Sequence, residues 1–209
     1  EAYCEAWREG RTGYPMIDAC MRALKETGWI NFRMRAMLMS FSSYHLWLHW
    51  RRPAVHLAKL FTDYEPGIHY SQAQMQSGTT GINSIRIYNP IKQGVDHDAS
   101  GDFIRKWVPE LRFASNEAIH NPTAANSRST DYPCPIVDEK IARKTAAEKI
   151  YNLRRATSHS EHAKKVFIKH GSRKSRTIRN HKDIKTNDNQ GELALDTSIK
   201  YTSSSKKNK

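Results

Sequence analysis

The sequence predicts an all-α fold, and three observations support that prediction. Apolar residues repeat at helical spacing over residues 15–61, Pro and Gly stand where helices begin and end, and no stretch alternates strongly enough for a sheet. With 209 residues, the chain is long enough for one domain with a hydrophobic core. It contains no run of about 18 apolar residues, so no membrane span is expected.

The first predicted helices follow from their end signals. Pro15 suits a first helical position, because its missing N–H would have no partner there, and Gly28 is expected to end that helix. Asn31 is the predicted N-cap of the next helix, residues 32–50. That helix is apolar on more than one face, so we expect it to be central and buried.

Weaker signals divide the rest of the chain into short elements. We expect, in order, a helix opened by Pro53 and ending near Phe61, a loop or short extended piece ended by Asn89-Pro90, a short helix over 101–111 broken by Pro109, and an amphipathic helix over 138–155.

Positive charge is concentrated in the last third of the chain. The formal net charge is +13, and residues 138–209 carry 19 Lys and Arg against 8 Asp and Glu. Beyond about residue 158, Ser, Lys, Asn, Thr and His dominate, and such a composition does not bury enough apolar surface to offset the entropy of ordering. We therefore predict a folded domain over residues 1–157 and a basic, disordered low-complexity tail over 158–209. The tail suggests a polyanionic partner or a solvated segment.

The cysteines predict free thiols. Cys4, Cys20 and Cys134 are an odd number and include no C-x-x-C pair. This pattern favours a reducing compartment, so we expect a cytoplasmic location, and it argues against a structural zinc site. No metal is expected.

One polar stretch interrupts the helical pattern. In "TDYEPGIHYSQAQMQSG" (62–78), the sequence breaks at Pro66-Gly67 and places Asp63, Glu65 and His69 within seven positions. Two interpretations are open: a solvated turn between helices, or a site that holds a ligand.

Four motifs stand out along the chain: "WREGRTGYPMIDACMRALKETGW" (7–29), "RIYNPIKQG" (86–94), "GDFIRKWVPEL" (101–111) and "DYPCPIVDEKIAR" (131–143). Together they resemble the C-terminal, FAD-binding helical domain of the cryptochrome/DNA photolyase family. They occur in the family's order, at nearly the family's spacing, and cover residues 7 to about 155.

The resemblance implies FAD as cofactor and gives the polar stretch a role. Asp63 and Glu65 match acidic positions that hold the pyrimidine edge and the ribityl side of FAD, and Tyr64 lies between them. Arg35 matches an arginine that pairs with Asp63 beside the flavin, an arrangement that would satisfy an arginine in a helix expected to be buried. His69 matches the position opposite flavin N5, which decides whether the one-electron-reduced flavin is an anion or a protonated neutral radical.

The chain departs from the family's pattern on the DNA side and in the electron relay. Phe32 replaces an asparagine that approaches the flavin and the damaged base pair, whereas Arg33 and Gln93 match positions near DNA. Trp50 matches the middle tryptophan of the light-driven relay. Where the family often has Trp-x-Trp, this chain has residues 73–75, "AQM", so the relay is broken at its flavin end unless another aromatic substitutes: Trp47, Tyr70 or Tyr44.

The function implied is light-driven electron transfer from FAD to pyrimidine dimers in damaged DNA, as in deoxyribodipyrimidine photolyase, a carbon–carbon lyase. Two alternatives stay open: a cryptochrome-like blue-light photoreceptor, and a flavin-free basic helical fragment that binds DNA. The N-terminal antenna domain and the first part of the flavin domain have no counterpart in the chain. We therefore expect them to be supplied in cis or in trans, and expect the fragment alone to be inactive.

Overall fold

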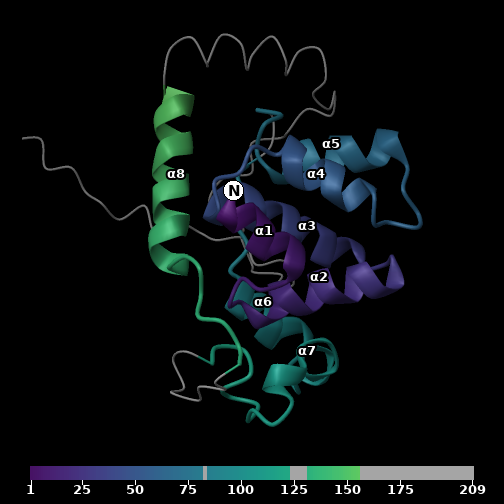
Figure 1. Ribbon diagram of the computed structural model, residues 1–209. Helices are drawn as coiled ribbons and strands as arrows, with labels where there is room; N and C mark the ends of the chain where they lie inside the picture. Colours follow the sequence, from purple (N-terminus) through teal and green to yellow (C-terminus); the bar gives the residue numbers. More distant parts are fainter. Residues whose placement is uncertain (82–83, 123–130, 156–209) are drawn as a thin grey trace, which may run out of the picture. The chain divides into compact units, whose positions relative to one another are not determined.

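Residues 1–81, 84–122 and 131–155 are described in the computed structural model of this chain, and the regular structure within these ranges is helical, without a strand. The all-α prediction is confirmed. The predicted tail lies outside the described residues, and no helix within them is long and apolar enough to cross a membrane. In chain order (Figure 1), the elements are α1 (Ala2–Glu9), α2 (Pro15–Thr27), α3 (Phe32–Ser40), the π-helix η1 (Phe41–His45), α4 (Arg51–Ala58), α5 (Pro66–Gln76), α6 (Pro90–His97), α7 (Asp102–Trp107), the 3-10 turn η2 (Pro109–Leu111) and α8 (Glu139–Arg155).

Helix α2 lies at the centre of the packing. It contacts α1, α3, α6 and α7, and most of its side chains are buried. Its ends are those predicted: Pro15 is in the first turn, and Gly28 stops the helix with a φ of 71°. Burying one large aliphatic side chain contributes about 1.5–3 kcal/mol, so the core around α2 is the main source of stability. Its fully buried members include Ile17, Met21, Leu24, Met37, Leu38 and Ile104.

The predicted helix over residues 32–50 is too long. Asn31 caps α3 as expected, since its side chain accepts a hydrogen bond from the Met34 amide, but the α-helix ends at Ser40 and continues as η1. Trp47 then adopts a left-handed φ of 51°, a conformation more usual for glycine at a helix end. The Leu48 amide folds back to the Ser42 carbonyl, which closes the helix end. The prediction failed because side-chain hydropathy does not report this backbone reversal.

Two prolines begin helices that were not predicted from the sequence: Pro66, which was interpreted as a break, and Pro90, where the predicted loop does end. Pro66 occupies the first turn of α5, and Pro90 occupies the first turn of α6, where the side chain of Asn89 caps the helix. The predicted loop after residue 78 therefore ends in a helix, and the polar stretch 62–78 is mostly helical. Helix α4 begins two residues before Pro53. Helix α7 and its end near Pro109 agree with the prediction.

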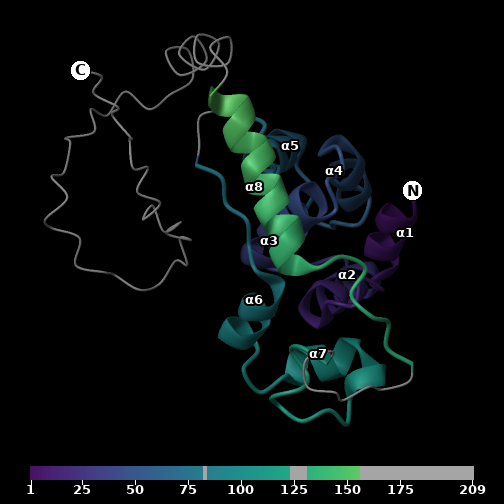
Figure 2. The same ribbon diagram turned by 90° about the vertical axis from the view of Figure 1, so that its left-hand side faces the viewer.

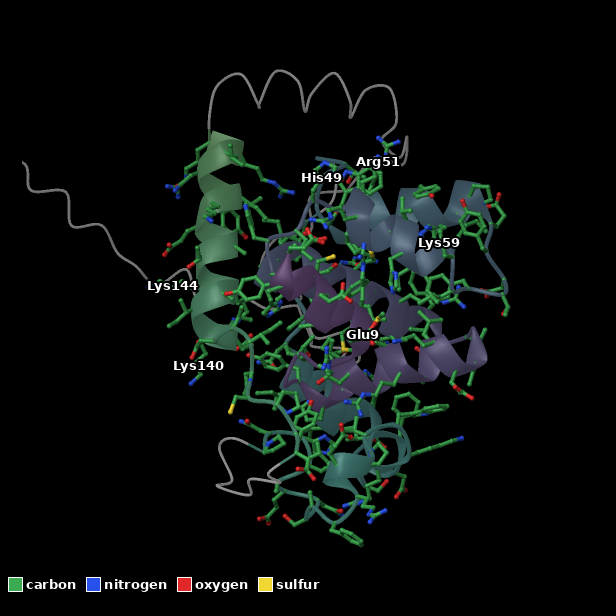
Figure 3. All side chains as sticks on the ribbon, viewed as in Figure 1. Glu9, His49, Arg51, Lys59, Lys140 and Lys144 are labelled. Carbon is green, nitrogen blue, oxygen red and sulfur yellow. The ribbon has the colours of Figure 1, made fainter. Side chains whose placement is uncertain are left out.

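Helix α8 packs against η1. It runs along one side of the other helices (Figures 1 and 2). Its first residue, Glu139, is buried, with its carboxylate 3.8 Å from His45 Nε2 and 2.9 Å from Arg143 Nε. Burial alone would raise the pKa of Glu139, but these two neighbours lower it below its ordinary value. Lys140 and Lys144 point away from the other helices (Figure 3), so this helix is basic on its outer side.

A buried carboxylate joins the start of α2 to a distant segment. Asp18 accepts hydrogen bonds from the backbone amides of Thr12 and Gly13 and from the hydroxyl of Tyr132, the last at 2.6 Å. The Ile136 amide donates to the Thr12 carbonyl in the same place. The segment before α8 therefore packs closely on the backbone at Gly13.

We predict that Gly13→Ala destabilises the fold by about 2–4 kcal/mol, because the residue has a φ of 78° and an added Cβ would lie 2.4 Å from the backbone of Cys134. Gly81→Ala is the matched control: its φ is 70°, but an added Cβ meets nothing within 4 Å, so only about 1–2 kcal/mol of backbone strain is expected. Urea unfolding measures both. Equal losses would show that the approach of residues 134–135 does not matter.

Candidate functional site

A cavity of about 160 Å³ lies between α3 and α5, next to the turn that joins α4 to α5. Most of its wall is apolar, and a few charged and polar side chains stand in it. It is lined by Phe32, Arg35, Ala36, Met39, Leu57, Phe61, Asp63, Tyr64, Glu65, Ile68, His69, Gln72, Ala73 and Gln76.

The predicted ion pair between Arg35 and Asp63 is present in the cavity wall. Arg35 Nη2 lies 2.8 Å from Asp63 Oδ2, its Nε donates to the Ile30 carbonyl, and its guanidinium lies over the Phe61 ring at 4.1 Å. The pair is less buried than predicted, because the Asp63 side chain is 50% exposed on the surface turn, whereas that of Arg35 is 23% exposed. The hydrogen bond from Arg35 lowers the pKa of Asp63 below its ordinary value.

Glu65 has a structural task besides any binding role. Its two carboxylate oxygens accept from the amides of Gly67, at 3.1 Å, and Ile68, at 2.6 Å, which makes Glu65 the N-cap of α5. Tyr64, beside it, is exposed, and its hydrogen bond with Tyr70 raises its pKa. The turn therefore contains two carboxylates with different partners: Asp63 pairs with Arg35 of α3, and Glu65 caps the N-terminus of α5.

His69 lines the cavity, and one of its ring nitrogens is hydrogen-bonded within the protein. Its Nε2 lies 2.8 Å from the Ala54 carbonyl, which only accepts, so this nitrogen carries the proton of the neutral ring and Nδ1 is left as an acceptor. The ring packs edge-on against three aromatic neighbours, Phe61, Tyr64 and Tyr70, with centroid distances of 5.1–5.8 Å. The geometry therefore fixes the ring and its tautomer.

The other predicted site residues are distributed differently. Phe32 lines the cavity and is 57% exposed, and Arg33, next to it, is partly exposed. Gln93 is buried in α6 and is not in the cavity wall. Trp50 lines a second cavity, of about 820 Å³, together with Tyr44 and Trp47. The structure thus brings Phe32 together with Arg35 and Asp63, but places Gln93 and Trp50 elsewhere.

Two lining residues were missed by sequence reasoning. Gln72 and Gln76 lie one turn apart on α5 and follow His69 along the same face. The available signal was Pro66, which begins a helix whose residues at spacing three and four share a face. Because this proline was interpreted as a break, the two glutamines were not considered.

Fold and site together define a helical domain with a largely apolar cavity whose wall carries a few charged and amide side chains. No group of three or more His, Cys, Asp or Glu suited to a metal is found within residues 1–81, 84–122 and 131–155. Residues 1–152 match the family described as the FAD binding domain of DNA photolyase. The chain belongs to this family, whose cofactor is FAD.

Relatives in the family include both photolyases and cryptochromes. The deoxyribodipyrimidine photo-lyase of Escherichia coli is 37% identical over 147 residues, 68% of this chain and 31% of that protein. Cryptochrome DASH of Danio rerio is 38% identical over 143 residues, 64% of this chain and 28% of that protein. The crystal structure of an archaeal photolyase from Sulfolobus tokodaii with two FAD molecules has a TM-score of 0.68 at 36% identity and covers 72% of this chain and 35% of that one. The chain thus spans about a third of the length of the curated relatives it matches.

We predict that the Arg35–Asp63 pair stabilises the fold by about 0.2–1 kcal/mol, as expected for a partly exposed pair. Because Arg35 lowers the pKa of Asp63 in the folded state, this contribution is present above the ordinary carboxyl pKa and is lost as pH falls through the folded value. Urea unfolding of wild type and Asp63→Asn between pH 2 and 7 should therefore show a difference that shrinks toward low pH. Glu26→Gln, at an exposed position on α2, is the control. A difference independent of pH would exclude the ion pair as its cause.

Proposed function

We propose that this chain forms part of a flavoprotein that uses light to transfer an electron to pyrimidine dimers in DNA. The observation that carries the proposal is the Arg35–Asp63 pair in the wall of a largely apolar cavity, in a chain of the FAD-binding photolyase family. The names of the photolyase relatives support the repair chemistry, and in this proposal the protein is a lyase that binds damaged DNA.

The residues of the cavity fit part of FAD. An isoalloxazine ring is planar and largely apolar with a polar edge, and the cavity offers apolar walls from both helices with charged and amide groups in them. Its volume, about 160 Å³, suits a portion of the cofactor. When bound, FAD supplies the photochemistry and the transferable electron.

Each site residue has a distinct proposed role. Arg35 and Asp63 hold the pyrimidine edge of the cofactor with a fixed charge pair, and Glu65 and Tyr64 bound the ribityl side of the cavity. His69 lies opposite flavin N5, where Nδ1 accepts or holds a proton while Nε2 stays on the Ala54 carbonyl. Their positions depend on α3, the turn and α5, which pack together.

On the scale of the whole protein, we propose that the chain is the C-terminal part of the FAD-binding domain, with residues 1–157 as the partial domain and 158–209 as a basic tail. The order of the four motifs along the chain is the support for this placement. The remaining flavin half and the antenna domain would act with it in cis or in trans. The free cysteines suit a cytoplasmic location.

The proposed DNA side is the mouth of the cavity, where Phe32 is exposed and Arg33 lies next to it. A flipped lesion would meet Phe32 there, and the Arg33 guanidinium would meet phosphate. Gln93 is buried, so its contact with DNA would need a change at α6. Trp50 lines the second cavity and would act in an electron relay at a distance from this one. At this cavity, the rings of Tyr64 and His69 line the wall, and the Tyr70 ring packs edge-on against both.

A second candidate is a cryptochrome-like photoreceptor. Phe32 favours it, because a large exposed apolar side chain at the mouth replaces a polar contact to the damaged base pair. Cryptochromes among the relatives agree with this reading.

Two measurements on the intact protein test the proposal. Visible absorption of the purified protein with FAD should show a bound flavin, and blue light should then restore dimer-containing DNA to intact bases. A protein that binds flavin but repairs no dimers would be assigned to the photoreceptor class. One that binds no flavin would refute both assignments.

We predict that His69→Asn changes how the visible spectrum of the reduced flavin in the intact protein depends on pH. Histidine can hold and release a proton near neutral pH, whereas an asparagine amide only hydrogen-bonds. The spectrum should be recorded during photoreduction with an external donor between pH 6 and 9. His49→Asn, at a position outside this cavity, is the control. An identical pH profile in His69→Asn and wild type would mean that solvent supplies the proton.

A further inference from the structure

The polar side chains of the cavity differ in how much of their hydrogen bonding is already used within the protein. Arg35 and Asp63 bond each other, the carboxylate of Glu65 caps α5, and His69 Nε2 bonds the Ala54 carbonyl. These groups would remain satisfied if the cavity held nothing.

The two glutamines are different. Among the cavity-lining residues, Gln72 Oε1 and Gln76 Oε1 are the side-chain polar atoms that are buried without a hydrogen-bond partner in the described part of the chain. Gln76 is only 3% exposed, so its amide does not find its partner in bulk water. An unpaired buried acceptor typically costs about 1–3 kcal/mol. Two of them, one turn apart on one helix face, point to a ligand that supplies donors.

The amide groups of Gln72 and Gln76 limit the chemical class of the ligand. A carboxamide presents an acceptor and a donor side by side, and its complement is an N–H flanked by a carbonyl. The rest of the wall includes Phe61, Leu57 and Met39, which suits a flat ring. A cyclic imide on a pyrimidine ring has both features.

We propose that Gln76, assisted by Gln72, binds the imide edge of a pyrimidine ring in this cavity and is a specificity-determining residue of the site. This deepens the proposed function and rests on it. The same edge occurs in two molecules of that function, a thymine of the damaged DNA and the pyrimidine ring of the flavin. Assignment to the flavin would place its imide edge at Gln76 and leave Arg35 and Asp63 at another part of the ring. The experiment separates these two sources.

The first arm uses FAD and N3-methyl FAD with the intact protein, and follows binding by quenching of flavin fluorescence. Methylation removes the imide N–H. If the flavin is the partner, wild type binds the methylated cofactor about 5- to 30-fold more weakly, as expected for losing a hydrogen bond to a buried acceptor. In Gln76→Leu the two cofactors bind alike, both at about the lower affinity.

The second arm uses the FAD-loaded protein and oligonucleotides with a thymine dimer, either unmodified or methylated at N3, and follows binding by fluorescence anisotropy. A loss of about 5- to 30-fold that disappears in Gln76→Leu assigns the amide to the lesion. Gln74→Leu is the matched control in both arms, because Gln74 is exposed on the same helix and does not line the cavity.

Stability of the cofactor-free protein distinguishes a ligand-binding amide from a structural one. If the amide is reserved for a ligand, Gln76→Leu leaves the melting temperature unchanged or raises it, because an unpaired buried oxygen is removed. A lower melting temperature with unchanged ligand discrimination overturns the proposal. If Gln76→Leu does not fold, Gln76→Met has nearly the same length and no amide, so it should show the same loss of discrimination between the methylated and unmodified ligands.

The outcomes also separate this inference from the proposed function. Discrimination that persists in Gln76→Leu in both arms overturns the inference while FAD binding by wild type upholds the cofactor. Wild type that binds neither FAD nor dimer-containing DNA overturns both.

Discussion

The start of helix α5 is the constraint on which the candidate site depends. Glu65 caps the helix with both carboxylate oxygens, and Pro66 occupies its first turn, so the helix begins here and in no other register. Because side chains three and four positions apart share a helix face, this start places His69, Gln72 and Gln76 along the cavity. A start shifted by one residue would rotate that face by about 100° and carry these groups out of the wall.

The turn before α5 connects the two helices that form the cavity. Asp63 forms an ion pair with Arg35, which belongs to α3, and Glu65, two residues later, caps the N-terminus of α5. The ion pair is half-exposed on the carboxylate side, so its contribution to folding is small and its main effect is on position and charge. A fixed positive group beside a flavin is a direct means of tuning its reduction, which connects this modest interaction to the proposed chemistry.

The buried polar groups of the chain divide into those satisfied by the fold and those left for something else. Asp18, although fully buried, accepts bonds from Thr12, Gly13 and Tyr132, and thereby fixes how the segment before α8 packs on α2. Gln76, equally hidden from water, has an oxygen with no such partner. The first pattern is that of a structural group, and the second underlies our proposal of a binding group, since an unsatisfied acceptor lowers stability unless a ligand pairs with it.

The sequence by itself determined the helical class, the ends of α2, the cap at Asn31 and the helix over 138–155. These follow from local rules, namely the spacing of apolar residues, the missing N–H of proline and the conformational freedom of glycine. The pairing of Arg35 with Asp63 was implied by the family resemblance, because no local rule selects a partner 28 positions away. Only the tertiary structure decided that the helix from residue 32 ends at η1, because the reversal at Trp47 depends on backbone bonds to Phe41 and Ser42. It also decided that Trp50 and Gln93 lie apart from the cavity, and that Gln72 and Gln76 belong to it. Whether a side chain is buried, and which hydrogen-bond partners it finds, depends on segments that are distant in the sequence. No local pattern in the chain therefore predicts which buried oxygen lacks a hydrogen-bond partner.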